Sequence, residues 1–243
     1  MVRAVDLNSD VGEGFGAWPG GPDRELISII TSANIACGFH AGDPSIIRRT
    51  CEMAAEKKVA IGAHVSYPDL AGFGRRFIDM RADELTDAVI YQLGALDGCA
   101  RVAGSAVTYV KPHGALYNTI VHHELQADAV AAAVRLYDPT LPLLGLPRTG
   151  SAIERAAAEH GLTFRFEGFA DRGYAPDGTL IPRGQPGALL TDDDAATKQA
   201  LDLADRGIAS ICLHSDTPGA AELAAAVAVG LLQAGYELRA FTR

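Results

Sequence analysis

Three polar residues are spaced two apart near the start of this chain: the carboxylates Asp6 and Asp10, which can do acid–base chemistry, and the amide Asn8 between them. In an extended segment, residues two apart project from the same face, so these three side chains would point together. The same spacing recurs in three later pairs: His64 with Ser66, Lys111 with His113, and His214 with Asp216. Carboxylates, imidazoles and an amine that converge on one cavity are suited to general acid–base catalysis.

Four of the seven histidines follow apolar runs and have a glycine or proline nearby, which lets the backbone approach a ligand. We interpret these four as functional: His40, His64, His113 and His214. The other three lie in or beside expected helices without glycine-rich surroundings, and we interpret them as surface residues: His122, His123 and His160.

Two further kinds of site are compatible with the histidines. Asp10, His40 and His64 could hold a divalent metal such as Zn, Mn or Mg, because carboxylates and neutral imidazoles are standard ligands. The sequence lacks the H-x-x-x-H and H-E-x-x-H patterns, which leaves this signal moderate. Cys37 and His40 could form a thiolate and its base, but an isolated cysteine after a strand is usually a small buried hydrophobe.

Arginines in glycine-rich segments are candidates for binding an anion. Arg75 and Arg76 follow a Gly-Phe-Gly run and could clamp a carboxylate or phosphate, and the same holds for Arg172 and Arg183. The alternative is that these side chains are simply solvated. The glycine-rich residues 12–16 lack the lysine and hydroxyl of a phosphate-binding P-loop, so they are weak evidence for a nucleotide site.

The elements that position these residues alternate between short apolar runs and amphipathic stretches. Strands are expected at 4–7, 33–37, 59–63, 107–111, 141–146, 163–166, 187–190, 208–213 and 236–241, of which 187–190 is weak. Helices are expected at 22–32, 45–58, 83–102, 124–137, 151–160, 193–206 and 218–234. The polar residues 167–186 are expected to form a long functional loop.

Continuous apolar strands that alternate with helices indicate an α/β fold with a parallel sheet covered by helices. The length of 243 residues suits a (β/α) barrel, with seven strands or an irregular number as variants, in which active-site residues follow the carboxyl ends of the strands. An open doubly wound sheet is the alternative. No linker or shift in composition divides the chain, so we expect one domain over residues 1–243.

Composition excludes several classes of partner. The chain has 21 Lys+Arg against 30 Asp+Glu, a formal charge of -9, which disfavours nucleic acid and anionic lipid. The longest apolar stretch, residues 223–232, is too short to span a membrane, and the N-terminal segment lacks a signal-peptide core. Four widely spaced cysteines argue against a disulfide framework. We expect a cytoplasmic protein, and a homo-oligomer is compatible with these data.

Seven segments together resemble the LamB/YcsF family: residues 6–16, 33–44, 62–70, 72–76, 110–118, 167–172 and 214–219. They span nearly the whole chain in the family's order. The resemblance implies a barrel of the glycoside hydrolase/deacetylase type. It also implies an activity, the ATP-dependent opening of 5-oxoproline to L-glutamate with two partner subunits, B and C. ATP would then be a co-substrate that binds with those partners, and Mg²⁺ or another divalent metal is compatible.

On this reading, Asp10 or Glu13 is the expected general base, and Lys111 faces the lactam oxygen or a transferred phosphate. His64 and His113 act as acid, base or polarising groups. The expected substrate contacts are Asn8, His40, Arg75, Glu167, Arg172 and His214. The alternatives are an ATP-independent metal-dependent amidase or deacetylase and a non-catalytic protein that only binds the substrate.

Overall fold

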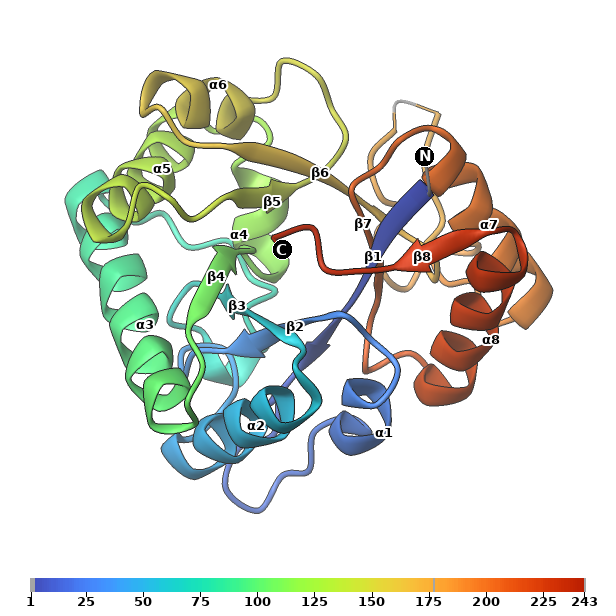
Figure 1. The fold of residues 1–243 in the computed structure, drawn as a ribbon. Helices are drawn as coiled ribbons and strands as arrows, with labels where there is room; N and C mark the ends of the chain where they lie inside the picture. Colours follow the sequence, from blue (N-terminus) through green and yellow to red (C-terminus); the bar gives the residue numbers. More distant parts are fainter. Residues whose placement is uncertain (1–2, 177, 243) are drawn as a thin grey trace.

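A computed structural model of the chain describes residues 3–176 and 178–242, so the first two residues of the N-terminal segment lie outside the described part. Parallel strands form a closed ring because the first strand pairs with both the second and the seventh (Figure 1). The strands of the ring are β1 (Arg3–Val11), β2 (Ser32–Ala36), β3 (Ala60–His64), β4 (Val107–Val110), β5 (Leu143–Gly145), β6 (Phe164–Phe169) and β7 (Ser210–Leu213). The fold is a seven-stranded parallel (β/α) barrel, as predicted, and the open doubly wound alternative is wrong.

Helices surround this barrel (Figure 1). They are α1 (Asp23–Ile27), α2 (Pro44–Lys57), α3 (Ala82–Val102), α4 (Gly114–Thr119), α5 (Glu124–Tyr137), α6 (Ala152–Glu159), α7 (Asp193–Asp205) and α8 (Ala220–Gln233), with a short 3₁₀ turn at Leu70–Gly72. The last strand, β8 (Tyr236–Leu238), pairs with the start of β1 and lies outside the ring. Among the helices that the structure describes, none has the length and apolar character needed to cross a membrane.

Strand β1 is longer than the expected 4–7, because its polar residues point into the barrel instead of ending the strand. Asp6, Asn8 and Asp10 are all buried, and they alternate with the buried Leu7. Burial of a polar group is tolerated where a hydrogen bond replaces water. The hydroxyls of Thr31 and Ser32 donate hydrogen bonds to Asp6 Oδ1 at 2.5 and 2.6 Å. Such bonds replace water as partners of the polar side chains on the inner face of the strand.

Three further expected elements differ from the structure, and one short helix was not expected. The weak strand at 187–190 is wrong, because Gly187 takes the left-handed conformation (φ +79°) and only Leu189 makes an isolated bridge, to Arg172. Strand β6 continues to Phe169, so Glu167 belongs to a strand rather than to the long loop. Helix α1 ends at Ile27 instead of reaching residue 32, where β2 already begins. Helix α4 has no counterpart among the expected helices, because it is only six residues long.

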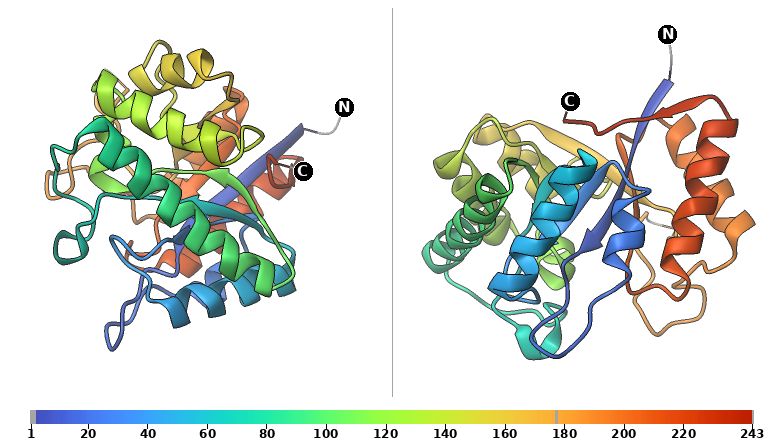
Figure 2. Two further views of the ribbon diagram at one scale, coloured as in Figure 1. Left: turned by 90° about the vertical axis from the view of Figure 1, so that its left-hand side faces the viewer. Right: turned by 60° about the horizontal axis from the view of Figure 1, so that its bottom comes forward.

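The loops after the carboxyl ends of the strands gather at one end of the barrel. The right-hand view of Figure 2 shows β1 running away from the N-terminus toward this end, where the loops after β1, β3 and β6 extend furthest. The described ends of the chain lie at the opposite end (Figure 2). The polar residues at the strand ends therefore share one mouth, while the chain ends stay clear of it.

The inner packing of the barrel supports a first prediction, at Gly62 of β3. A Cβ at this position would lie 2.1 Å from Cζ of the fully buried Tyr109, whose hydroxyl donates to Asn34 Oδ1 at 2.6 Å. We expect Gly62→Ala to lower the free energy of unfolding by about 1–3 kcal/mol, because the ring must move. Urea denaturation measures this change.

A matched control for this prediction is Gly94→Ala, because Gly94 lies on α3 and a Cβ there meets no atom within 4 Å. Alanine is a better helix former than glycine, so this variant should keep or raise the stability by up to about 1 kcal/mol. The packing argument fails if Gly62→Ala is as stable as Gly94→Ala.

A second prediction concerns the pH dependence of stability and rests on Asp6. Burial raises the pKa of Asp6 from 3.8 to about 6, against the hydrogen bonds from Ser210, Ser32 and Thr31. Between pH 4 and 6 the folded state therefore binds more protons than the unfolded state, so this group lowers stability as the pH rises. Asp6→Asn should reduce the loss of stability between pH 4 and pH 7 by on the order of 3 kcal/mol.

Urea unfolding of the wild type and of Asp6→Asn at pH 4, 5, 6 and 7 measures this difference. The matched control is Asp87→Asn on the exposed face of α3, which should follow the wild-type pH profile. An Asp6→Asn variant whose profile coincides with that of the control contradicts the raised pKa.

Candidate active site

A buried lysine occupies the interior of the barrel near the mouth. The ammonium nitrogen of Lys111, which directly follows β4, lies 2.9 Å from Asp10 Oδ1 and 3.2 Å from Glu167 Oε2. It also lies 3.1 Å from Sγ of Cys212 on β7. Burial opposes the charged form, but Asp10 and the neighbouring groups outweigh it and hold the pKa of Lys111 well above its usual value. The lysine is therefore a fixed positive charge.

Two asparagines hold the carboxylates around this charge. Asn34 of β2 donates to Asp10 Oδ1 at 2.8 Å and to Asn8 Oδ1 at 2.7 Å. Asn8 in turn donates to Glu167 Oε2 at 3.3 Å and to Ser210 Oγ at 2.6 Å. The other oxygen of Glu167, Oε1, is buried and has no hydrogen-bond partner among the described residues.

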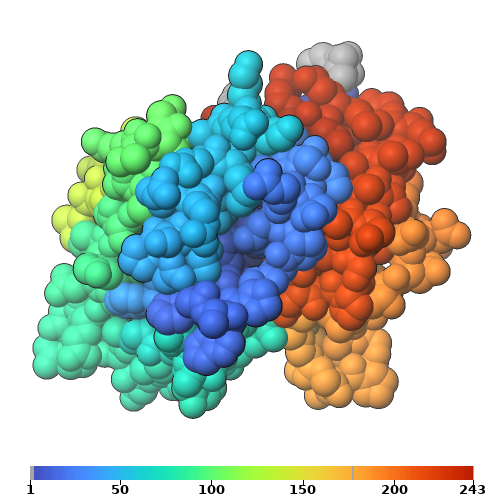
Figure 3. Space-filling model, turned by 90° about the horizontal axis from the view of Figure 1, so that it is seen from below, coloured from blue at the N-terminus to red at the C-terminus, as the bar shows by residue number. Residues whose placement is uncertain are grey.

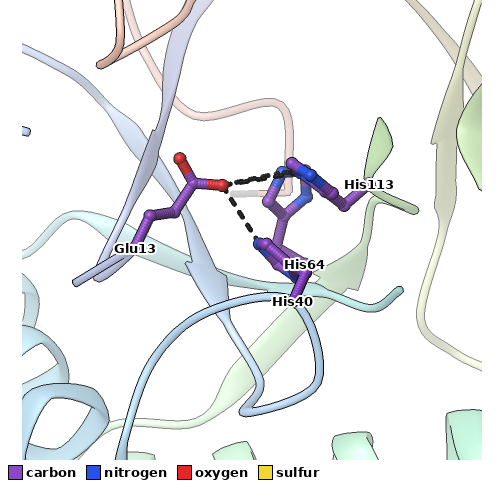
Figure 4. A group of neighbouring side chains, drawn as sticks. All are labelled: Glu13, His40, His64 and His113. Carbon is purple, nitrogen blue, oxygen red and sulfur yellow. Dashed lines mark hydrogen bonds and ion pairs between the residues drawn. The ribbon is translucent and has the colours of Figure 1, made fainter. Parts of the chain in front are cut away.

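Three imidazoles and one carboxylate converge on one another in the same mouth, as Figure 4 shows. Oε1 of Glu13, from the loop after β1, lies 3.0 Å from His40 Nε2 and 3.4 Å from His113 Nδ1. His64, the last residue of β3, places Nε2 3.0 Å from His113 Nδ1 and 3.4 Å from Asp10 Oδ1. His40 stacks on His113 with a ring-centroid distance of 3.8 Å, and both rings are edge-on to His64.

The pKa values of these imidazoles move in opposite directions. Burial lowers the pKa of His113 far below its usual value and also lowers the pKa of His40, so both rings are neutral at pH 7. Burial acts the same way on His64, but the charge of Asp10 overcomes it and raises the pKa of this ring. Burial alone would raise the pKa of Asp10, yet His64 and Lys111 hold it well below the usual range.

A carboxylate–imidazole pair faces the lysine from β7. Nδ1 of His214 lies 3.1 Å from both oxygens of Asp171, which also accepts hydrogen bonds from the His214 backbone N–H and from the Thr217 hydroxyl. The imidazole stacks on Phe169 with an interplanar angle of 11°. These contacts fix the ring so that Nε2 lies 3.9 Å from Asp10 Oδ2. Nε2 is therefore the nitrogen of His214 that faces the mouth.

The mouth of the barrel contains a cavity of about 660 Å³. Its walls come from the segments after β3, β4 and β6. The segments after β3 and β6 project on the same side of the molecule in Figure 3, where they are teal and orange. Arg75 and Arg183 line the cavity, and both form ion pairs with Asp216, Arg183 at 3.0 Å. Arg172 also lines it and donates to the carbonyl oxygens of Ala188 and Ile181.

The structure brings most of the expected site residues together. Those that line the cavity are Asp10, His64, Arg75, Lys111, His113, Arg172 and His214. Asn8, Glu13, His40 and Glu167 do not line it, but each contacts a residue that does. Arg76 points elsewhere and pairs with Asp69. Cys37 directs its thiol to the carbonyl oxygen of Ile35 at 3.3 Å, and burial raises its pKa, which makes it unsuited to be a nucleophile.

Several residues with structural roles in the site were not among those expected. Asn34 carried a usable signal, because asparagine is depleted in strands and this one lies inside an apolar run. Asp171 follows β6 at the start of the long polar loop, as catalytic residues of barrels often do. Tyr117 and Cys212 gave no signal, because their contacts depend on a short helix and on barrel closure.

Comparison with known proteins shows the family. The model of the LamB/YcsF family matches residues 5–243. The chain is 54% identical to a protein from Mycolicibacterium paratuberculosis that is named as the A subunit of 5-oxoprolinase, over 99% of this chain and 100% of that protein. It is 53% identical to the protein of the same name from Streptomyces coelicolor, over 98% and 99% of the two chains.

Solved structures agree with this relationship. The crystal structure of a lactam utilization protein from Thermus thermophilus superposes with a TM-score of 0.91 at 41% identity, and the match covers 98% of this chain and 99% of that one.

Two carbohydrate-modifying enzymes share the fold alone. A family 4 carbohydrate esterase from Streptomyces lividans has a TM-score of 0.52 at 13% identity, covering 97% of this chain and 91% of that one. The catalytic domain of a peptidoglycan N-acetylglucosamine deacetylase from Eubacterium rectale has a TM-score of 0.54 at 9% identity, covering 99% and 89%. The barrel therefore has the same fold as these two enzymes, and the chain belongs to the LamB/YcsF family.

Proposed function

We propose that this chain is the A subunit of an ATP-dependent 5-oxoprolinase, which opens the lactam of 5-oxo-L-proline to give L-glutamate while ATP becomes ADP and phosphate. The observation that carries the proposal is the identity of more than 50% over the full length of proteins with that name. A lettered name supports the presence of partners, which we assign as subunits B and C. ATP is the co-substrate and binds together with these partners.

A lactam needs activation because its amide carbonyl is a poor electrophile. Phosphorylation of the lactam oxygen by ATP gives an imidate whose carbon water can attack. The C–N bond then breaks and the nitrogen takes up a proton, which leaves γ-glutamyl phosphate. A second water hydrolyses this acyl phosphate to glutamate and phosphate. The protein must hold the substrate carboxylate, activate water, deliver a proton to nitrogen and stabilise negative charge on oxygen.

The buried ammonium of Lys111 is suited to the last of these tasks, because it is permanently charged and lines the cavity. It faces the lactam oxygen or the phosphate transferred to it. Glu167 does not line the cavity, and its Oε2, 3.2 Å from the ammonium nitrogen, holds the lysine from behind. A donor fixed in a water-poor site stabilises charge without reorganisation.

Proton transfer is assigned to the imidazoles and acids around this lysine. His214 is held by Asp171 and presents Nε2 to the cavity beside Asp10, so it takes the proton of water and later delivers it to the nitrogen. Asp10 or Glu13 remains the alternative base, and His64 and His113 polarise the reacting groups. Asn8 and His40 support these residues from behind the cavity.

The arginines at the rim of the cavity are suited to the substrate carboxylate. Arg75 and Arg183 share Asp216 as a partner, and Arg172 lies in the same wall. Arg75, whose guanidinium carbon lies 5.0 Å from the ring centroid of Phe73, is the primary contact. A guanidinium binds a carboxylate through two parallel hydrogen bonds, which fixes the orientation of the ring.

The proposed function predicts that glutamate forms from 5-oxoproline only when this chain, subunits B and C, and ATP are all present. The measurement is chromatographic detection of glutamate in reactions that omit each component in turn. Glutamate formed by the chain alone without ATP would overturn the ATP-coupled reading and favour the metal-dependent amidase. If the partners were fully active without this chain, the chain would be dispensable for the reaction, and the alternative that it only binds the substrate would be favoured.

A second prediction tests the role of Lys111. Lys111→Met keeps much of the side-chain volume but removes the charge, so kcat of the reconstituted enzyme should fall by about 10²–10³-fold. Steady-state kinetics of the three-subunit complex gives this value, and circular dichroism checks that the barrel is folded. The control is Lys57→Met at the exposed end of α2, which should keep the wild-type kcat. A Lys111→Met enzyme within threefold of that control contradicts the assignment.

A further inference from the structure

We propose that Glu13, His64 and His113 bind one divalent metal ion of the zinc class, with His40 holding Glu13 in position. The inference starts from convergence, because these side chains come from the ends of β1, β2, β3 and β4 and one donor atom of each lies within 4.8 Å of the others (Figure 4). The proposal stands apart from the identity of the substrate, since it concerns only the donor atoms of this chain.

Hydrogen bonds to the backbone fix which nitrogen of two imidazoles carries the hydrogen. Nδ1 of His64 lies 2.9 Å from the carbonyl oxygen of Lys111, and Nε2 of His113 lies 2.9 Å from the carbonyl oxygen of Phe73. A carbonyl oxygen only accepts, so each of these nitrogens must be the donor. In the neutral rings, the nitrogens that remain are His64 Nε2 and His113 Nδ1, and each carries a lone pair.

These two nitrogens face each other at 3.0 Å, so a proton on one of them or a metal ion bound by both must offset the repulsion of their lone pairs. Oε1 of Glu13 adds a third electron-pair donor, 3.4 Å from His113 Nδ1 and 3.9 Å from His64 Nε2. A single proton can form a hydrogen bond between only two of these three atoms. A metal ion accepts electron pairs from all three at once, and the charge of the carboxylate favours it.

The distances agree with a metal of small radius. Donor atoms 2.0–2.1 Å from a tetrahedral centre are about 3.3–3.4 Å apart, by the geometry of zinc sites. The three distances observed, 3.0, 3.4 and 3.9 Å, bracket that value. The imidazole planes of His64 and His113 cross at 88°, so both rings can direct a nitrogen to one ion.

His40 is assigned a positioning role because of its stacking. Its ring is parallel to that of His113, with an interplanar angle of 7° and centroids 3.8 Å apart, and one ion cannot lie in the plane of both. His40 instead donates from Nε2 to Glu13 Oε1 at 3.0 Å. Metal-bound imidazoles and carboxylates typically have such outer partners, here His40 and the carbonyl oxygens of Lys111 and Phe73.

Three protein ligands leave a position open toward the cavity, which His64 and His113 both line. This pattern of two histidines and one carboxylate is that of catalytic rather than structural zinc sites. When bound, the metal would supply a Lewis acid for a carbonyl, phosphoryl or water oxygen. The neighbouring group Asp10, Cys212 and His214 is unsuited to a metal, because the Lys111 ammonium already lies 2.9 and 3.1 Å from the first two.

The experiment uses the full chain without an affinity tag, stripped with a chelator and then dialysed with one equivalent of Zn²⁺ or Co²⁺. We expect one bound ion per chain by mass spectrometry of the metal, a rise in melting temperature, and visible Co²⁺ absorption of a four- or five-coordinate site. None of these readouts depends on activity. Failure of the proposed function would leave them unchanged.

Variants locate the site. Glu13→Gln and His113→Gln should bind Zn²⁺ at least 100-fold more weakly, and His40→Gln about 10–100-fold more weakly, the usual effect of losing an outer partner. His160→Gln, which removes a surface imidazole paired with Asp128, should bind as the wild type does. Stoichiometry near zero in the wild type, or equal affinity in Glu13→Gln and His160→Gln, would overturn the proposal.

Discussion

Burial of one positive charge governs the interior of this barrel. An ammonium removed from water is stable only if opposite charges and hydrogen bonds replace its hydration. Asp10 and Glu167 do so for Lys111 at 2.9 and 3.2 Å, and Asn8 and Asn34 hold those carboxylates in place. The polar residues spaced two apart on β1 are therefore a requirement of the buried lysine as much as of any substrate.

The same need for partners orients the imidazoles. Each of three rings has one nitrogen occupied by a fixed acceptor: a backbone carbonyl for His64 and for His113, and Asp171 for His214. The other nitrogen of each ring is thereby directed inward. Because the acceptors belong to the barrel and its loops, the orientation of the reactive atoms follows from the fold. A site of this kind is preorganised for charge stabilisation and proton transfer.

Burial and exposure separate the tasks within the site. The ionisable groups of the interior are almost entirely buried, and Lys111 is 2% exposed, whereas the Arg75 side chain at the rim is 39% exposed. An exposed arginine such as Arg75 can attract an anion from solvent, and without one it pairs with Asp216. The interior groups act where water is scarce and electrostatic interactions are strong. Under the proposed function, substrate capture and chemistry would thus use different parts of the mouth.

The sequence by itself determined the parallel barrel, because apolar runs alternate with amphipathic helices, and it placed His64, Lys111 and His214 at strand ends. It did not determine which groups would touch. The contacts of Lys111 with Asp10 and Cys212 join residues 101 positions apart in each direction, and they exist only because β1 pairs with β7 and closes the ring. The spacing of residues in the sequence predicts on which face of a strand a side chain lies. The closure of the barrel and the register of its strands set the distances between side chains across it.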